Sequence, residues 1–412
     1  MQIFDYFFSK HYLNQKAFRN STEDDEFLLE RMFVIDNINQ RSPFYENLAD
    51  TKIDISNVKN IKLKRMAKVK TNALVLYRNN QNTLTRCIDS ILPYFDSILL
   101  VDTGTTDSSA MIASKYKDLH PLKIVMENYI WNNDFSSARN FAISKIDTGW
   151  CCFFDSDEWL SHHECTKLLI LLNHLQGYSN IKNSFLSPIF SNNGSTKSFS
   201  SGRFFLKNSG LKYSGSIHEE LVGSAFKTIE NIMINVTINH DGYSIESMPE
   251  KTKRNNLYLS KEISRNPTSI KYKFYFHRNR IINTPPSNVN NIMSALSFTK
   301  KLTELENYQE YAIELIFCML VYSLNCKQYN LIDHIQYVIT ENTLTLDILY
   351  IMSVIKIERG DQPGTILETI TQYSNRTSHI PISYLPIKEK HIDNLVQYCI
   401  SNRSNSIHNI RK

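Results

Sequence analysis

The chain has 412 residues, enough for two or three domains, and its hydrophobic fraction of 42% can supply a sizeable core. Only 11 of the 412 residues are glycine, and they form neither the G-x-G-x-x-G nor the G-x-x-x-x-G-K phosphate-binding loop. The formal net charge of +5 is far from the strongly basic balance of a dedicated nucleic-acid-binding protein. These features exclude both glycine-rich phosphate loops and give no reason to expect a nucleic-acid partner.

The first 69 residues are predicted to form an N-terminal helical segment. Leu28, Met32 and Ile35 have helical spacing and follow Ser21 and Thr22, which are suitable N-caps. The segment leads into a basic stretch, residues 59–70, which a solvated surface explains better than contact with an acidic ligand. Charged and polar residues interrupt the Phe-rich N-terminus, so we do not expect a signal peptide.

From residue 73 strands and helices are predicted to alternate. Three short apolar runs predict strands, at Ala73–Tyr77, Ile98–Val101 and Cys151–Phe154. Helical patterns lie between them, at Thr83–Leu92, Ser108–Tyr116 and Ser136–Lys145. This order is typical of a parallel α/β sheet, in which ligands bind beyond the carboxyl ends of the strands.

After residue 265 the strand signals fade and a C-terminal helical domain is predicted for residues 266–412. Its helical stretches are Tyr272–Ile282, Val289–Leu305, Tyr308–Leu324, Leu331–Ile339, Thr345–Glu358 and Thr365–Tyr373. Tetratricopeptide-like pairs and an irregular bundle both stay open, because no 34-residue period is clean. Aromatic residues such as Phe274 and Phe317 suit either a homodimer surface or core packing.

Cysteine usage and hydropathy bear on the compartment. The seven cysteines include no C-x-x-C pair, so we expect reduced, mostly buried thiols in a cytoplasmic protein. The longest apolar run, Leu315–Tyr322, is far shorter than the roughly 18 residues that a membrane span needs. No membrane span is predicted.

The sharpest motif is Asp155-Ser156-Asp157, a D-x-D that follows the apolar run ending at Phe154. Alternation along an extended strand would send both carboxylates to one side and Ser156 to the other, so both could converge on one hard cation. A D-x-D by itself is weak, because helix caps and surface turns often contain one.

The motif stands in a longer pattern. The elements are Leu74-Val75-Leu76-Tyr77-Arg78-Asn79, Ile98-Leu99-Leu100-Val101-Asp102-Thr103-Gly104-Thr105-Thr106-Asp107, Asn133-Asp134-Phe135-Ser136-Ser137-Ala138-Arg139-Asn140, and then the D-x-D. In order and spacing they resemble the nucleotide-sugar half of family 2 glycosyltransferases. The likeness continues through Arg203-Phe204-Phe205, residues 213–221 and Asn239-His240-Asp241-Gly242-Tyr243, and is greatest to the sublancin-type bacteriocin peptide S-glycosyltransferases. One departure is Thr105, where the wider family often has Ser.

The resemblance implies a GT-A-type domain, a Rossmann-like mixed sheet, over residues 70–265. It implies a divalent metal, Mg²⁺ or Mn²⁺, held by Asp155, Asp157 and His218, which would neutralise charge on the departing diphosphate. The residues that it implies for the nucleotide sugar are Leu76, Tyr77, Asp102, Asp134, Arg139, Asp155 and Ser156. A structural histidine is the alternative for His218.

Some roles stay open. Glu219 is expected to be the general base, with Glu220 as its rival, since neighbouring residues of an extended segment face opposite ways. Asp102 could instead cap the helix near Ser108, and Arg139 could pair with a phosphate or with Asp134.

The implied reaction is an inverting transfer of a hexose from UDP-glucose or UDP-N-acetylglucosamine to a cysteine, or a serine, of a bacteriocin precursor peptide. Two alternatives remain. The acceptor could be a cell-surface glycan or lipid-linked sugar, or the chain could be a protein-binding scaffold with an inactive transferase domain, against which the presence of Asp155, Asp157, His218 and Glu219 argues.

Overall fold

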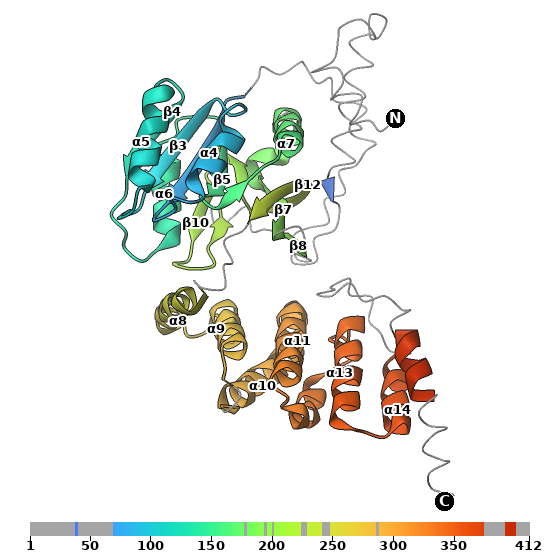
Figure 1. Ribbon diagram of the computed structural model, residues 1–412. Helices are drawn as coiled ribbons and strands as arrows, with labels where there is room; N and C mark the ends of the chain where they lie inside the picture. Colours follow the sequence, from blue (N-terminus) through green and yellow to red (C-terminus); the bar gives the residue numbers. More distant parts are fainter. Residues whose placement is uncertain are drawn as a thin grey trace, which may run out of the picture. The chain divides into compact units, whose positions relative to one another are not determined.

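The computed structural model describes residues 38–39, 69–176, 179–192, 196–199, 202–223, 229–240, 248–285, 288–374 and 392–400 (Figure 1). These fall into two compact units that divide between Met248 and Pro249. The boundary predicted after residue 265 falls at the end of helix α8 (Met248–Arg265). The helix predicted around Leu28–Ile35 lies outside the described residues.

The first unit is built on a mixed sheet. Its described strands are β1 (Ile38–Asn39), β2 (Thr71–Tyr77), β3 (Ser97–Asp102), β4 (Ile124–Asn128), β5 (Trp150–Asp155), β6 (Glu158–Trp159), β7 (Ser184–Asn192), β8 (Thr196–Phe199), β9 (Phe204–Leu206) and β12 (Glu230–His240). The order is β1-β12-β7-β9-β5-β2-β3-β4, with β6 beside β12 and β8 beside β7. Strands β5, β2, β3 and β4 are parallel, whereas β9 joins β5 and β7 in antiparallel fashion. The predicted α/β class is therefore confirmed.

Both faces of this sheet are covered, because consecutive residues of its central strands are apolar and buried. On one face Ala73 and Val75 of β2 share a core with α4 (Leu84–Ile91), α5 (Ser109–Leu119) and α7 (His162–Leu175). On the other face Leu74 shares a core with α6 (Phe135–Ser144) and with a hairpin of β10 (Lys212–Ser214) and β11 (Glu220–Val222). The strands and helices predicted between residues 73 and 154 are all present, each shifted at its ends by a few residues at most.

The second unit is helical within its described residues. After α8 come α9 (Ile270–Ile282), α10 (Asn290–Thr303), α11 (Gln309–Asn325), α12 (Ile332–Ile335), α13 (Leu346–Arg359) and α14 (Pro363–Ser374), and residues 392–400 are also helical. The long helix predicted for Leu331–Ile339 is wrong in extent, since α12 is one turn flanked by 3₁₀ turns. Ile332, Ile335, Val338 and Ile339 are β-branched, which lowers helix propensity. The helical character predicted for this region is confirmed.

The expectation that most cysteines are buried is confirmed. All seven cysteines are free, and five of them are buried. Burial raises the pKa of Cys318 to about 12 and that of Cys151 to about 12. Among the helices that the structure describes, none combines the length and apolar character needed to span a membrane.

Candidate active site

The carboxyl ends of three parallel strands meet at one edge of the sheet. In the pairing of β2 with β3, Tyr77 lies opposite Asp102, and in the pairing with β5, Leu76 lies opposite Asp155. The predicted site residues at these three strand ends are thus neighbours in space. The order of the strands, with β2 in the middle, produces this convergence.

The loops after β2 and β3 are held together by side chains. Asp102 Oδ1 accepts hydrogen bonds from the backbone N–H groups of Gly104 and Thr105, both at 2.8 Å. Asn79 Oδ1 accepts from the N–H of Thr106 at 2.7 Å, and Asp107 accepts from the N–H of Ser109 at 2.9 Å. Asp107, not Asp102, therefore supports the start of α5. Asp102 shapes the loop that closes over the strand end.

Tyr77 is buried beneath that loop. Its carbonyl oxygen accepts hydrogen bonds from the N–H and the hydroxyl of Thr103, at 3.0 and 3.1 Å. Burial and the neighbouring Asp102 carboxylate raise the pKa of the phenol of Tyr77. The carbonyl oxygen of Tyr77 thus bonds to the loop, and its side chain interacts with Asp102.

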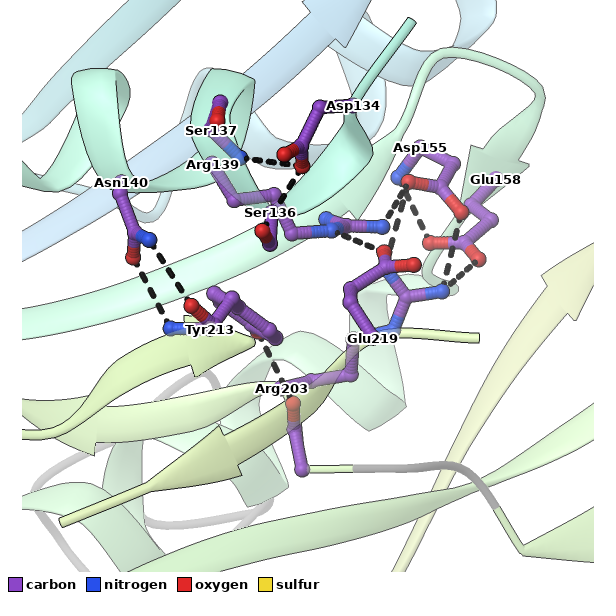
Figure 2. Close-up of polar contacts among 11 residues, drawn as sticks. Asp134, Ser136, Ser137, Arg139, Asn140, Asp155, Glu158, Arg203, Tyr213 and Glu219 are labelled. Atoms are coloured by element: carbon purple, nitrogen blue, oxygen red, sulfur yellow. Dashed lines mark hydrogen bonds and ion pairs between the residues drawn. The ribbon is translucent and has the colours of Figure 1, made fainter. Parts of the chain in front are cut away.

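Helix α6 positions Arg139. Asp134 is its N-cap and accepts hydrogen bonds from the N–H of Ser137 at 2.9 Å and the hydroxyl of Ser136 at 2.8 Å (Figure 2). Further along, the amide of Asn140 makes two hydrogen bonds with the backbone of Tyr213, each of 2.9 Å. These contacts fix the helix against the β10–β11 hairpin, so that Arg139 points to the end of β5.

Two buried arginines and three carboxylates form one cluster there, which we call the arginine–carboxylate cluster: Arg139, Arg203, Asp155, Glu158 and Glu219 (Figure 2). Arg139 donates from Nε to Glu219 at 2.7 Å and from Nη2 to Asp155 at 3.0 Å. Arg203 grips both oxygens of Asp155, at 3.2 and 2.9 Å, and donates to Glu158 at 3.0 Å. Arg139 therefore pairs with Asp155 and Glu219, and not with Asp134.

The charges in this cluster are strongly coupled. Burial favours the neutral form of Asp155, but the two guanidinium groups outweigh it and hold its pKa well below the usual range. Burial raises the pKa of Glu158, although its oxygens accept hydrogen bonds from Arg203 and from the N–H of Asp155. Asp155 is thus a fixed negative charge at the strand end.

The second aspartate of the D-x-D does not follow the strand. β5 ends at Asp155, and Ser156 and Asp157 form a turn before β6, so the alternation expected to bring the two carboxylates to one side does not extend to Asp157. Asp157 Oδ2 instead lies 3.4 Å from His240 Nε2. Burial lowers the pKa of His240, but the hydrogen bond and charge of Asp157 outweigh it, and the net shift is upward. Ser156 is buried in the turn.

His240 was given no role in the sequence analysis, although it lies in one of the motifs that carry the family likeness. It is the last residue of β12 and pairs in register with Glu158 of β6. That antiparallel pairing brings it beside the turn. Only the sheet register reveals the contact.

The two candidate bases have different surroundings. Glu219 is largely buried in the cluster. Of its two carboxylate oxygens, Oε1 accepts a hydrogen bond from Arg139, and Oε2 has no hydrogen-bond partner within the described part of the chain. Glu220 is exposed on β11, opposite Ser214. His218 just before them has a φ of 51°, a left-handed conformation, and is half-buried. Glu219 is therefore the one that reaches Arg139 and the strand ends.

Carboxylates outnumber guanidinium groups at the site. Asp155, Glu158 and Glu219 surround Arg139 and Arg203, and Asp157 lies beside His240 in the turn that follows β5. Mg²⁺ in proteins is typically bound through one or two carboxylates together with substrate phosphates. In the described part of the chain no three His, Cys, Asp or Glu side chains are grouped as a metal site. The set Asp155, Asp157 and His218 stays a prediction.

Comparison with known proteins finds a family match within the first unit of the chain. Residues 73–201 match the model of glycosyl transferase family 2. The SPbeta prophage-derived glycosyltransferase SunS of Bacillus subtilis (strain 168) is 25% identical over 292 residues, which cover 69% of this chain and 66%, just under two thirds, of SunS. The lipopolysaccharide core biosynthesis glycosyltransferase LpsC of Rhizobium meliloti (strain 1021) is 29% identical over 94 residues, or 23% of this chain and 33% of LpsC.

Among solved structures, the mannosyltransferase PcManGT from Pyrobaculum calidifontis, in complex with GDP-Man and Mn²⁺, has a TM-score of 0.36 and 13% identity, covering 66% of this chain and 90% of that one. The fold likeness carries no part of the argument, which depends on the sequence matches. These matches support a glycosyl transferase family 2 domain at residues 73–201, in a chain that is similar to SunS over 69% of its length.

Proposed function

We propose that this chain is a cytoplasmic, inverting, metal-dependent transferase that moves glucose or N-acetylglucosamine from a UDP-sugar to a cysteine of a bacteriocin precursor peptide. The observation that carries the proposal is the arginine–carboxylate cluster at the end of β5, beside the ends of β2 and β3, with Glu219 turned into it. A divalent metal at Asp155 and Asp157 would supply charge stabilisation for the diphosphate.

In this reaction the acceptor sulfur forms a bond to the anomeric carbon, the bond from that carbon to the diphosphate oxygen breaks, and UDP leaves. The thiol proton goes to Glu219, whose ionised carboxylate accepts hydrogen bonds but donates none. Arg139 lies between Glu219 and Asp155, so its positive charge is placed where negative charge develops on the leaving group. Asp102 and the loop that it shapes would hold the uridine or ribose.

Acceptor choice has two candidates. Similarity to SunS spans 69% of this chain, whereas similarity to LpsC spans 23%, which favours the peptide acceptor that the sublancin-type resemblance implies. A surface glycan is the second candidate. A cysteine thiol suits the site, because its pKa near 8.5 makes deprotonation by a carboxylate easier than for a serine hydroxyl.

The test is a transfer assay read by intact-mass spectrometry. Purified protein is incubated with UDP-glucose or UDP-N-acetylglucosamine, Mg²⁺ or Mn²⁺, and a cysteine-containing bacteriocin precursor, with the Cys→Ser peptide in parallel. We expect one sugar to be added to the cysteine peptide and little or none without metal. No added mass with either donor would overturn the proposal.

Two matched variants assign the base. Glu219→Gln should abolish transfer, while Glu220→Gln, at an exposed position on β11 opposite Ser214, should retain it. Loss of activity only in Glu220→Gln would show that the base is misassigned.

A further inference from the structure

Two members of the arginine–carboxylate cluster, Arg203 and Glu158, have no part in the proposed chemistry, yet they make most of the contacts to Asp155. Arg203 covers both carboxylate oxygens of Asp155, and Glu158 accepts a hydrogen bond from the N–H of Asp155 at 2.8 Å. Arg203 and Glu158 also bond to each other at 3.0 Å. The three residues therefore form a closed ring that includes both the backbone and the side chain of Asp155 (Figure 2).

The ring rests on rigid backbone. The N–H of Arg203 donates to the carbonyl of Leu186 at 2.9 Å, and its carbonyl accepts from the N–H of Phe153 at 3.0 Å, so it is fixed between β7 and β5. Its side chain is 10% exposed and that of Glu158 is 2% exposed. Buried polar partners with this many contacts have little freedom to rotate.

The ring also limits how many further hydrogen bonds or metal contacts the carboxylate of Asp155 can accept. Its Oδ1 accepts from both Arg139 and Arg203, and its Oδ2 accepts from Arg203. A carboxylate oxygen has two lone pairs, so one acceptor direction, on Oδ2, is left for a ligand. The orientation of that single direction is set by the fork of Arg203.

We propose that Arg203 and Glu158 are positioning residues of the donor site, which hold the carboxylate of Asp155 in the orientation in which its remaining acceptor direction would face the metal of the bound nucleotide diphosphate. Neither touches the reacting atoms. The inference depends on the proposed function, because it concerns the affinity of the same site for its nucleotide. Loss of such an outer partner typically costs about 10- to 100-fold in affinity or activity.

The experiment measures UDP binding by calorimetry in the presence of Mn²⁺, together with the steady-state constants and the thermal midpoint, on the full chain. The variants are Arg203→Gln, Arg203→Lys and Glu158→Gln. Lys167→Gln is the matched control. Lys167 on α7 is similarly buried, forms an ion pair with Glu164 and donates a hydrogen bond to the carbonyl of Asn235, and these contacts lie outside the cluster.

We expect Arg203→Gln and Glu158→Gln to weaken UDP binding by about 10- to 100-fold and to raise KM for the donor, with KM for the acceptor unchanged. Arg203→Lys should restore part of the affinity, since it keeps the charge but loses the two-pronged contact. Lys167→Gln should lower the thermal midpoint without changing UDP affinity.

The inference is overturned if the two Gln variants bind UDP as the wild type does, or if their loss merely equals that of Lys167→Gln. Should Arg203→Gln fail to fold, Arg203→Lys and Glu158→Gln decide the matter by the same criteria. If the wild-type protein itself binds no UDP, the proposed function fails first and the inference falls with it.

Discussion

Replacing Arg139 is the most direct test of how the site is held together. Its Nε and Nη2 reach Glu219 and Asp155 at 2.7 and 3.0 Å, and its guanidinium lies 5.2 and 5.3 Å from the ring centres of Phe153 and Tyr213. Arg139→Met removes the charge but keeps much of the apolar stem, and Arg139→Lys keeps the charge but loses the fork.

The expected cost follows from burial. Removing one partner of a buried ion pair costs about 3–5 kcal/mol, because the remaining charge is left uncompensated. Asp155 keeps Arg203, so Glu219 carries most of that penalty, and we expect Arg139→Met to lose about 4 kcal/mol. An ammonium group cannot span both carboxylates, so Arg139→Lys should lose one charged hydrogen bond, about 2 kcal/mol. Both losses are smaller than the 5–15 kcal/mol typical of a folded protein.

The assay is urea unfolding followed by tryptophan fluorescence. All three tryptophans, Trp131, Trp150 and Trp159, lie in the first unit, so the signal reports that unit. Lys145→Met is the control, because Lys145 caps the same helix and forms an ion pair with Glu127 in which both side chains are about one third exposed. An exposed pair contributes about 0–1 kcal/mol.

Two results would refute this reasoning. One is an Arg139→Lys protein as stable as the wild type, which would mean that the fork makes no contribution. The other is an equal loss in Lys145→Met, which would mean that burial does not set the cost.

Three further predictions concern other parts of the chain. Gly202→Ala should cost about 1–3 kcal/mol by urea unfolding and weaken UDP binding, because the added Cβ would lie 2.2 Å from Phe185 beside Arg203; an unchanged midpoint would contradict it. Asp134→Ala should cost about 1 kcal/mol through the lost N-cap of α6, with Asp134→Ser restoring most of it in the same assay. At neutral pH, Asp361→Asn should destabilise the helical unit, whose unfolding is measured by far-ultraviolet circular dichroism. Since Arg359 lowers the pKa of Asp361, the difference should shrink below the unfolded pKa of about 3.9 and vanish as pH falls through the lower folded pKa; a difference that persists in acid would refute it.

Local patterns predicted the elements of the sheet well. Strand β5 differs from the predicted run by one residue at each end, and α6 begins and ends one residue before the predicted positions. Such elements depend on apolar periodicity and on caps such as Asp134, which are local in sequence. The carboxyl-end rule then identified the edge where Asp102 and Asp155 lie.

The contacts within the site are a different matter, because they are long-range. Arg139 and Glu219 are 80 positions apart in the sequence, and Arg203 and Asp155 are 48 apart. The first contact depends on the packing of α6 against the β10–β11 hairpin, and the second on the antiparallel register of β9 against β5. No local pattern encodes either arrangement. The turn at Ser156 and Asp157 was missed for a related reason: β6 leaves the direction of β5 to pair with β12, and alternation stops where a strand stops.

The scarcity of glycine acquires a structural explanation in the loops at this edge. Asn79 takes a φ of 55°, a left-handed conformation for which glycine is the usual choice, and its side-chain oxygen bonds to the next loop. The carboxylate of Asp102 bends its loop by accepting hydrogen bonds from the backbone N–H groups of Gly104 and Thr105. Gly104 has a φ of 102°, and this backbone conformation requires glycine. Asn and Asp side chains thus build turns that glycine-rich loops build with bare backbone. The consequence is chemical as well as structural, because the strand ends carry side-chain oxygens and guanidinium groups where a glycine-rich loop would present backbone N–H groups. The proposed function therefore relies on side chains and a metal, and not on a backbone cradle, to bind the diphosphate.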